Sequence, residues 1–231
     1  MISIADNINS VSLRIQNATK SAGRQAGEVA LLAVSKTKPS EAIRAAYAAG
    51  LRDFGENYLQ EALQKIQELS DLSIQWHFIG PLQSNKTRQV AEHFHWIHTV
   101  DRLKIATRLS EQRPENMPLL NVCIQVNIDE EDSKSGVPLD EVKSLAADIA
   151  KLPRLCLRGL MCIPNPSHDQ STLAESFRKV AAVAEDLKSR HNTIDTLSMG
   201  MSQDMEVAIA EGSTIVRIGT AIFGERDYSG R

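Results

Sequence analysis

The fold of this chain is decided around residues 31–39, which read Leu31-Leu32-Ala33-Val34-Ser35-Lys36-Thr37-Lys38-Pro39. An apolar stretch of strand length ends here in a lysine before a proline, which predicts a buried strand over residues 31–36. We therefore expect Lys36 at the carboxyl end of a strand, where α/β folds keep their chemistry. A lysine in such a place can lose hydration, which lowers its pKa and frees the amine to form a Schiff base with an aldehyde. Taken alone, the run favours a simpler role, in which Lys36 ends the strand and reaches solvent.

Composition and charge describe one globular protein of moderate size. The 231 residues are 42% hydrophobic, which is enough for one sizeable core, and we expect a single domain over residues 1–231. The formal net charge of -3 argues against a general nucleic-acid surface, which needs clustered excess lysine and arginine. No apolar run reaches the length of a membrane span, and no basic segment precedes an apolar one at the amino terminus. We predict a soluble, cytoplasmic protein.

The three cysteines, Cys123, Cys156 and Cys162, lie in apolar stretches without CxxC spacing. This pattern indicates neither a disulfide framework nor a zinc site, and we expect no bound metal. The cysteines are predicted to be reduced core residues.

Strand and helix patterns alternate along the whole chain. A helix over the first twenty residues precedes strand 31–36, and further strands are predicted at residues 53–57, 76–80, 96–100, 121–127, 155–163, 196–200 and 215–220. A helical pattern follows every strand but the last, as in residues 58–69, where Leu59, Leu63, Ile66 and Leu69 form an apolar stripe. Eight such units predict an α/β protein with a (β/α)₈ TIM barrel. A doubly wound open sheet is the competing arrangement, but eight open strands would leave edges that need cover.

In a closed barrel, the strand ends are neighbours in space, so residues far apart in sequence can form one site. Lys36 and Asn57 end the first two strands, and the last two strands and their loops carry Ser198, Met199, Ser202, Arg217, Gly219 and Thr220. Barrels commonly bind phosphate at these last two loops, through backbone N–H groups and a helix N-terminus. Ser202, predicted as the N-cap of a helix reaching Glu211, supplies one part, and Gly219-Thr220 supply the other. Ordinary capping and an ordinary turn are the alternatives.

Arg217 lies inside an apolar strand, two residues before the second of these loops. An unpaired charge in the interior is very costly, so we expect the guanidinium to find an acceptor. Either it pairs with a carboxylate as a structural ion pair, or it donates to a ligand atom. The residue types alone favour neither.

Several long motifs together resemble one known family. They are residues 32–39 around Lys36, Phe54-Gly55-Glu56-Asn57-Tyr58, the run from Trp76 to Lys86, Arg158-Gly159-Leu160-Met161, Leu197-Ser198-Met199-Gly200-Met201-Ser202, and the run from Val216 to Gly224. The chain resembles the pyridoxal phosphate homeostasis protein family, also called the YggS or PROSC family. The resemblance runs essentially end to end.

This resemblance implies an alanine racemase-like barrel in which Lys36 carries pyridoxal 5'-phosphate as a Schiff base. By position, it implies that Ser202, Gly219 and Thr220 hold the phosphate, that Asn57 lines the ring, and that Arg217 faces the pyridine nitrogen. Ser198, Met199 and Met161 are implied near the cofactor. Lys38, Lys86 and Lys134 are further amines that could hold the cofactor transiently, although a surface role is expected for each.

The resemblance implies a protein that buffers or delivers pyridoxal phosphate in vitamin B6 homeostasis, with apo-enzymes as recipients, and that works as a monomer. Robust catalysis is not expected, because an arginine at the ring nitrogen leaves that nitrogen unprotonated and the ring is then a poor electron sink. The first alternative is a low-activity, pyridoxal phosphate-dependent amino-acid racemase. The second is a barrel enzyme acting on a sugar phosphate, with Lys36 as its Schiff-base residue and no cofactor.

Overall fold

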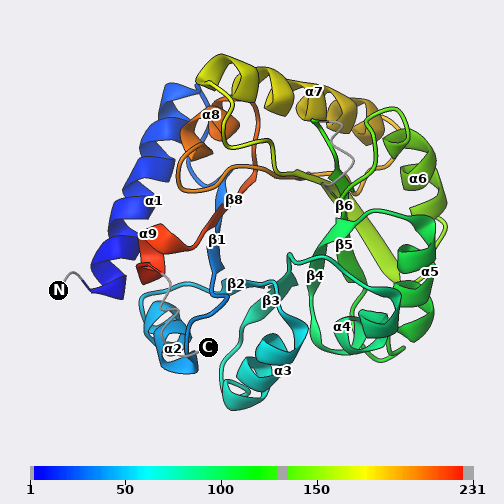
Figure 1. The fold of residues 1–231 in the computed structure, drawn as a ribbon, viewed down its shortest axis with the longest axis horizontal. Coiled ribbons are helices and arrows are strands. Elements are labelled where there is room, and N and C mark those ends of the chain that lie inside the picture. The colour runs from blue at the N-terminus through cyan, green and yellow to red at the C-terminus, as the bar shows by residue number, and fades with distance from the viewer. Residues whose placement is uncertain (1–2, 130–134, 226–231) are drawn as a thin grey trace.

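The chain folds as a closed barrel of eight parallel strands. In the computed structural model, which describes residues 3–129 and 135–225, the strands pair in chain order and β8 pairs back with β1. Figure 1 shows the helices as an outer ring around these strands. The predicted (β/α)₈ barrel is confirmed, and the doubly wound alternative is wrong, because β1 pairs with β2 on one side and with β8 on the other.

The strands are β1 (Ala30–Val34), β2 (Asp53–Glu56), β3 (Gln75–Phe78), β4 (Trp96–Val100), β5 (Leu120–Val126), β6 (Leu155–Cys162), β7 (Thr196–Ser198) and β8 (Ile215–Ile218). The helices are α1 (Ile4–Ser21), α2 (Ser40–Ala48), α3 (Leu59–Glu68), α4 (Thr87–His93), α5 (Leu103–Gln112), α6 (Val142–Ile149), α7 (Gln170–Lys188), α8 (Met205–Ala210) and α9 (Thr220–Phe223). A short 3₁₀ helix, η1 (Ser84–Lys86), leads into α4.

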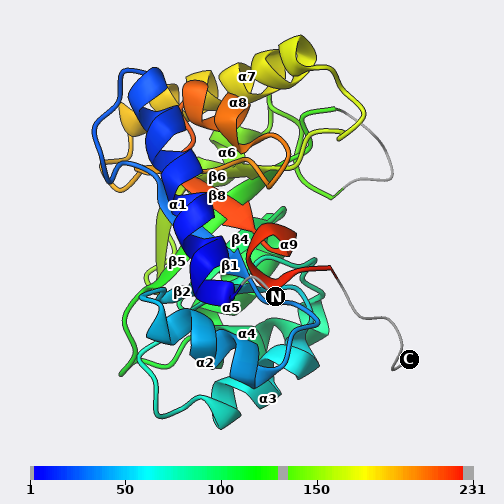
Figure 2. The same cartoon turned by 90° about the vertical axis from the view of Figure 1, so that its left-hand side faces the viewer.

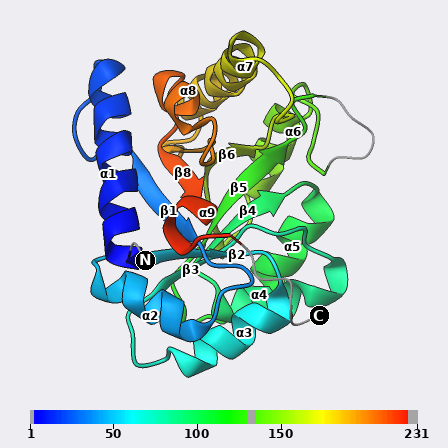
Figure 3. The same cartoon turned by 60° about the vertical axis from the view of Figure 1, so that its left-hand side comes forward.

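Helix α1 covers the side of the barrel where the chain closes. It begins with a capping box, in which the Ser3 hydroxyl accepts from the Asp6 N–H and the Asp6 carboxylate accepts from the Ser3 N–H. Ile8, Val11 and Ile15 recur at helical spacing and are buried. The helix packs against α8, α9 and α2, as Figures 2 and 3 show from two sides. It therefore supports the elements that follow β7, β8 and β1.

The longest described helix, α7, is amphipathic. Its buried residues include Leu173, Phe177, Val180, Ala184 and Leu187, which repeat on one face. Its exposed residues are mainly polar or charged, such as Ser171, Glu175 and Lys179. Within residues 3–129 and 135–225, the helices include none that is long and apolar enough to cross a membrane.

All the predicted strands except 96–100 end one or two residues earlier than expected, and three of these ends concern the site. β1 ends at Val34, because the backbone turns and the Lys38 N–H donates to the Ser35 carbonyl. β7 ends at Ser198, before Gly200 takes a positive φ of 92°. β8 ends at Ile218, and α9 forms where only a tail was expected. The strand ends therefore carry tight turns.

Candidate functional site

Lys36 lies in a turn two residues beyond β1, half-buried at the carboxyl end of the barrel. The preceding residue still pairs with the sheet, since the Ser35 N–H donates to the Gly55 carbonyl on β2 at 3.0 Å. The following residue, Thr37, has a φ of 64°, which is uncommon for a residue with a branched side chain. Such strained conformations persist only where the surroundings impose them. The turn that presents Lys36 is therefore held in place by its neighbours.

A buried polar cluster between β2 and α3 supplies that restraint. Lys65, which is 4% exposed, donates to the Ser35 carbonyl at 2.8 Å, to Glu56 at 2.8 Å and to Glu61 at 2.5 Å. Because an ammonium has three donors, all of them are used. The Ser35 hydroxyl in turn donates to Glu56 at 2.6 Å.

The same cluster also reaches the other side of Lys36. The Glu61 carboxylate that accepts from Lys65 accepts from the Thr37 N–H at 2.5 Å. Burial raises the pKa of the fully buried Glu56 carboxyl, and the Lys65 ammonium works against that rise. The residues on both sides of Lys36 are thus bound to one ion-paired cluster. We call Ser35, Glu56, Glu61 and Lys65 the Lys36 support cluster.

Arg217 on β8 is 5% exposed and points into the barrel end formed by β6 and β7. Its guanidinium donates to the Ser198 carbonyl at 2.5 Å, to the Ser198 hydroxyl at 2.8 Å and to the Cys162 carbonyl at 3.0 Å. These contacts use three of the five N–H groups of an arginine. The other two make no hydrogen bond within residues 3–129 and 135–225.

The acceptors of Arg217 bear on the two roles left open by the sequence. In the described part of the chain, no carboxylate lies within ion-pair distance of the guanidinium, so the structural ion pair is absent there. Burial lowers the pKa of Arg217, but an arginine starts so high that it stays charged at neutral pH. The chain therefore holds a buried cation that has donors to spare at the carboxyl end of the barrel.

Two histidines extend the Arg217 contacts through the barrel interior. His98 on β4 lies 2.8 Å from the Ser198 hydroxyl through Nδ1 and 3.0 Å from His77 through Nε2, and His77 on β3 lies 3.1 Å from Asp53. Burial lowers the pKa of both imidazoles, and the positive charge of Arg217 lowers that of His98 further. Both histidines are therefore neutral at pH 7.

The loops that carry Ser202 and Gly219 lie side by side, because the Arg217 N–H donates to the Gly200 carbonyl at 2.9 Å. Ser202 is not the N-cap of α8, as the sequence analysis expected. Asp204 occupies that position, and its carboxylate accepts from the Met201 N–H at 2.5 Å. The loop is longer than predicted, which leaves Ser202 within it and half-buried.

Two contacts fix these loops to their surroundings. Arg14 of α1 donates to the Ser202 carbonyl at 3.1 Å. A Cβ at Gly219 would lie 3.2 Å from the Val34 carbonyl, so the turn after β8 packs tightly against the end of β1. Thr220 opens α9 and is exposed.

Asn57 follows β2, and its buried side-chain oxygen has no hydrogen-bond partner among the residues that the structure describes. Its position depends on Gly80, because a Cβ at Gly80 would lie 2.1 Å from the Asn57 carbonyl. A buried amide oxygen without a partner is costly, so it marks a place where a donor is expected. Asn57 thus adds an open acceptor to the same end of the barrel.

Met161 and Met199 are fully buried. Met161 pairs with Ser198 across β6 and β7, whereas Met199 packs within the hydrophobic core. The structure therefore places Met161 next to the Arg217 contacts and gives Met199 a packing role.

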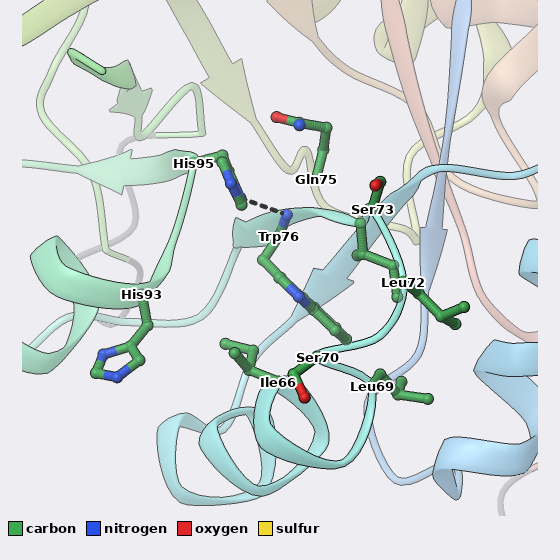
Figure 4. A pocket seen from close by; sticks show the side chains of 10 residues that line it. Ile66, Leu69, Ser70, Leu72, Ser73, Gln75, Trp76, His93 and His95 are labelled. Carbon is green, nitrogen blue, oxygen red and sulfur yellow. Dashed lines mark hydrogen bonds between the residues drawn. The ribbon is translucent and has the colours of Figure 1, made fainter. Parts of the chain in front are cut away.

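A pocket of about 410 Å³ opens at the other end of the barrel, near the start of β3. Figure 4 shows it between the α3–β3 connection and His93 and His95, with the His95 ring accepting from the Trp76 N–H. Its lining consists of Ile66, Leu69, Ser70, Leu72, Ser73, Ile74, Gln75, Trp76, His93 and His95. None of the predicted site residues borders this pocket.

Comparison with known proteins identifies the family. The chain matches a family model described as the alanine racemase N-terminal domain over residues 11–227. The pyridoxal phosphate homeostasis protein of Pseudomonas aeruginosa is 58% identical over 228 residues, which cover 99% of this chain and 98% of that protein. The chain belongs to the pyridoxal phosphate homeostasis protein family. The protein of that name from Escherichia coli K12 is also 58% identical, over 99% of both chains. The predicted family is confirmed.

A solved structure extends the match from the family's sequence to its fold. PipY of Synechococcus elongatus PCC7942, in a structure with PLP bound, is 37% identical to this member of the family, with a TM-score of 0.83. The match covers 96% of this chain and all of PipY. A structure of PipY without PLP gives a TM-score of 0.85.

We predict that the Lys36 support cluster stabilises the fold as an ion-paired unit. Lys65→Met should lower the free energy of unfolding by about 3 to 5 kcal/mol, because it leaves the buried Glu56 carboxylate without its cation. Adding Glu56→Gln should restore part of the loss, since the fully buried carboxylate is then removed and only the partly exposed Glu61 is left without the lysine. Urea denaturation measures both.

Lys179→Met is the matched control, because Lys179 forms an exposed pair with Glu175 on α7. Its cost should stay below about 1 kcal/mol. Equal losses for Lys65→Met and Lys179→Met would contradict the account.

Proposed function

We propose that this protein binds pyridoxal 5'-phosphate through the Lys36 amine and takes part in vitamin B6 homeostasis, buffering or delivering the cofactor. The observation that carries the proposal is the buried Arg217, whose two unused N–H groups lie at the barrel end where the turn holding Lys36 is fixed. The PLP-bound structure of PipY and the names of the curated relatives support it.

The groups at this end of the barrel fit the cofactor in kind. An amine suits an aldehyde, and a guanidinium donor suits an unprotonated pyridine nitrogen. The buried Asn57 oxygen, which has no partner in the described part of the chain, offers an acceptor beside the ring. When bound, pyridoxal phosphate supplies an aldehyde that bonds reversibly to amines, which suits storage and transfer.

We assign the phosphate to the two loops after β7 and β8. Ser202 supplies a hydroxyl, and Gly219 and Thr220 supply backbone N–H groups. Two observations support this choice: the Arg217–Gly200 hydrogen bond places the loops side by side, and α1 holds the first of them through Arg14. Ser198 accepts from Arg217, and Met161 pairs with Ser198 across β6 and β7. We place both near the ring.

The role of Arg217 favours binding over catalysis. A guanidinium keeps its proton, so it donates to the ring nitrogen without protonating it. A racemase also needs a base on the opposite face of the substrate. Tyr47 is occupied at the end of α2, where Arg52 lies 3.8 Å over its ring, and Tyr58 is 46% exposed. Tyr228 lies outside the described residues.

The proposal also has to account for the other lysines that could hold the cofactor. Lys38 donates to the Glu225 carbonyl at 2.6 Å, which supports a structural role over transient attachment. Lys134 lies outside the described residues, and Lys86 ends η1.

We infer that apo-enzymes are the recipients and that the protein acts as a monomer in the cytoplasm. The free state of Cys123, Cys156 and Cys162 agrees with a reducing compartment.

We predict that the purified protein with added cofactor shows a yellow absorbance band that Lys36→Ala removes. The band reports the bond between the cofactor and an amine, so it requires the attachment lysine. Lys38→Ala, two residues away on the same turn, is the matched control and should keep the band. A band that survives Lys36→Ala and disappears with Lys38→Ala would overturn the assignment.

We predict that Ser202→Ala weakens cofactor binding about tenfold or more, because a hydrogen bond to a charged group is lost. Ser171→Ala, an exposed serine on α7, should leave the affinity unchanged. The measurement is the dissociation constant from an absorbance titration. Unchanged affinity for Ser202→Ala would move the phosphate away from this loop.

A further inference from the structure

A chain of hydrogen bonds runs through the barrel interior and ends at Arg217. Its members come from five strands: Asp53 on β2, His77 on β3, His98 on β4, Ser198 on β7 and Arg217 on β8. Because β4 and β7 are not neighbours in the closed barrel, the contact between His98 and Ser198 spans the interior. His98 and Ser198 are fully buried, and the Asp53 side chain is 43% exposed. The chain therefore has a carboxyl group, Asp53, at its partly exposed end and a guanidinium, Arg217, at its buried end.

The two ends of the chain force a single direction of donation. Arg217 can only donate, so the Ser198 hydroxyl oxygen accepts from it at 2.8 Å. Within the described residues, that hydroxyl has one other partner, His98 Nδ1 at 2.8 Å. Because a buried O–H without an acceptor is costly, the hydroxyl donates to Nδ1. His98 therefore carries its proton on Nε2.

The same argument fixes the second imidazole. His98 Nε2–H donates to His77 Nδ1 at 3.0 Å, so His77 also carries its proton on Nε2. That N–H donates to Asp53 at 3.1 Å, and an ionised carboxylate can only accept. Reasoning from Asp53 inward gives the same pattern. The chain is thus fully satisfied with two neutral histidines in one tautomer.

Packing holds the chain in this arrangement. The His77 ring stacks on Trp96, with ring centres 5.4 Å apart and planes 6° from parallel. Arg158 lies 4.7 Å over the Trp96 ring. Among the described residues, the hydrogen bond from Ser198 to His98 is the link between these histidines and the predicted cofactor residues.

We propose that Asp53, His77 and His98 are positioning residues, whose one-directional chain fixes the Ser198 hydroxyl and thereby aims the Arg217 guanidinium at the ring nitrogen of the cofactor. The inference rests on the proposed function. Because His98 holds the Ser198 hydroxyl, this hydroxyl is a fixed acceptor for one Arg217 nitrogen. That contact in turn orients the remaining N–H groups of the guanidinium. Without His98, the hydroxyl is free to rotate and the guanidinium loses a fixed partner.

The test compares two ligands that differ only at the ring nitrogen: pyridoxal 5'-phosphate and its analogue with carbon in place of that nitrogen. We expect His98→Leu to weaken binding of the first about tenfold, as for a lost hydrogen bond to a charged group, and to leave the second unchanged. His98→Gln should recover the affinity for pyridoxal 5'-phosphate that His98→Leu loses, because the glutamine amide can accept from Ser198 and donate to His77. An equal effect on both ligands, or none on either, would overturn the proposal.

His95→Leu is the matched control, since His95 accepts from the Trp76 N–H outside the chain. It should leave the ratio of the two affinities unchanged, and a change as large as that of His98→Leu would count against the proposal.

A second measurement needs no variant and no cofactor. Nitrogen-15 NMR of the wild-type protein at pH 7 should show His77 and His98 protonated on Nε2. A proton on Nδ1 of either ring would overturn the chain. Failure of the wild-type protein to bind either ligand would instead contradict the proposed function, and the NMR result would still decide the chain.

Discussion

The structure depends on the pairing of β1 with β8, which closes the barrel. Residues 30–33 of β1 lie opposite residues 215–218 of β8, so Leu32 is paired with Arg217. This pairing brings the strand that leads to Lys36 beside the strand that carries the buried arginine, although 180 residues separate them in sequence. Helix α1 covers the same side and holds the loops after β7 and β8. Without closure, the amine and the guanidinium would belong to opposite edges of a sheet.

Two buried polar systems prepare the site from different sides. The Lys36 support cluster lies between β2 and α3 and binds the residues before and after Lys36, whereas the chain from Asp53 to Ser198 lies inside the barrel and contacts Arg217. Buried charges and polar groups are costly unless their partners are in place. Most polar groups of both systems have partners in the protein itself, although the second Glu56 oxygen, Oε2, is buried without a hydrogen-bond partner among the described residues. The amine and the guanidinium are therefore positioned before a ligand arrives, which reduces the entropy lost on binding.

Patterns of apolar residues predicted the barrel and the order and approximate place of its strands, because period and segment length help to distinguish strands from helices. They did not predict the support cluster. The expected apolar stripe on residues 58–69 included Leu63 and Ile66, but the buried face runs through Leu59, Ala62 and Lys65. A lysine four residues after Glu61 was the available signal, although it normally marks a surface pair. His77 and His98 were missed for a similar reason: alternation in a strand does not tell which polar residues point inward. The end of β7 and the cap of α8 depend on loop hydrogen bonds that no periodicity records.

The central claim is that Lys36, and no other amine, is the attachment point. Borohydride reduction of the protein with bound pyridoxal 5'-phosphate makes the bond permanent, and peptide mapping by mass spectrometry then locates it. The account predicts a pyridoxyl adduct on the peptide containing Lys36, at that residue. An adduct found mainly on Lys38 or Lys134 would contradict it.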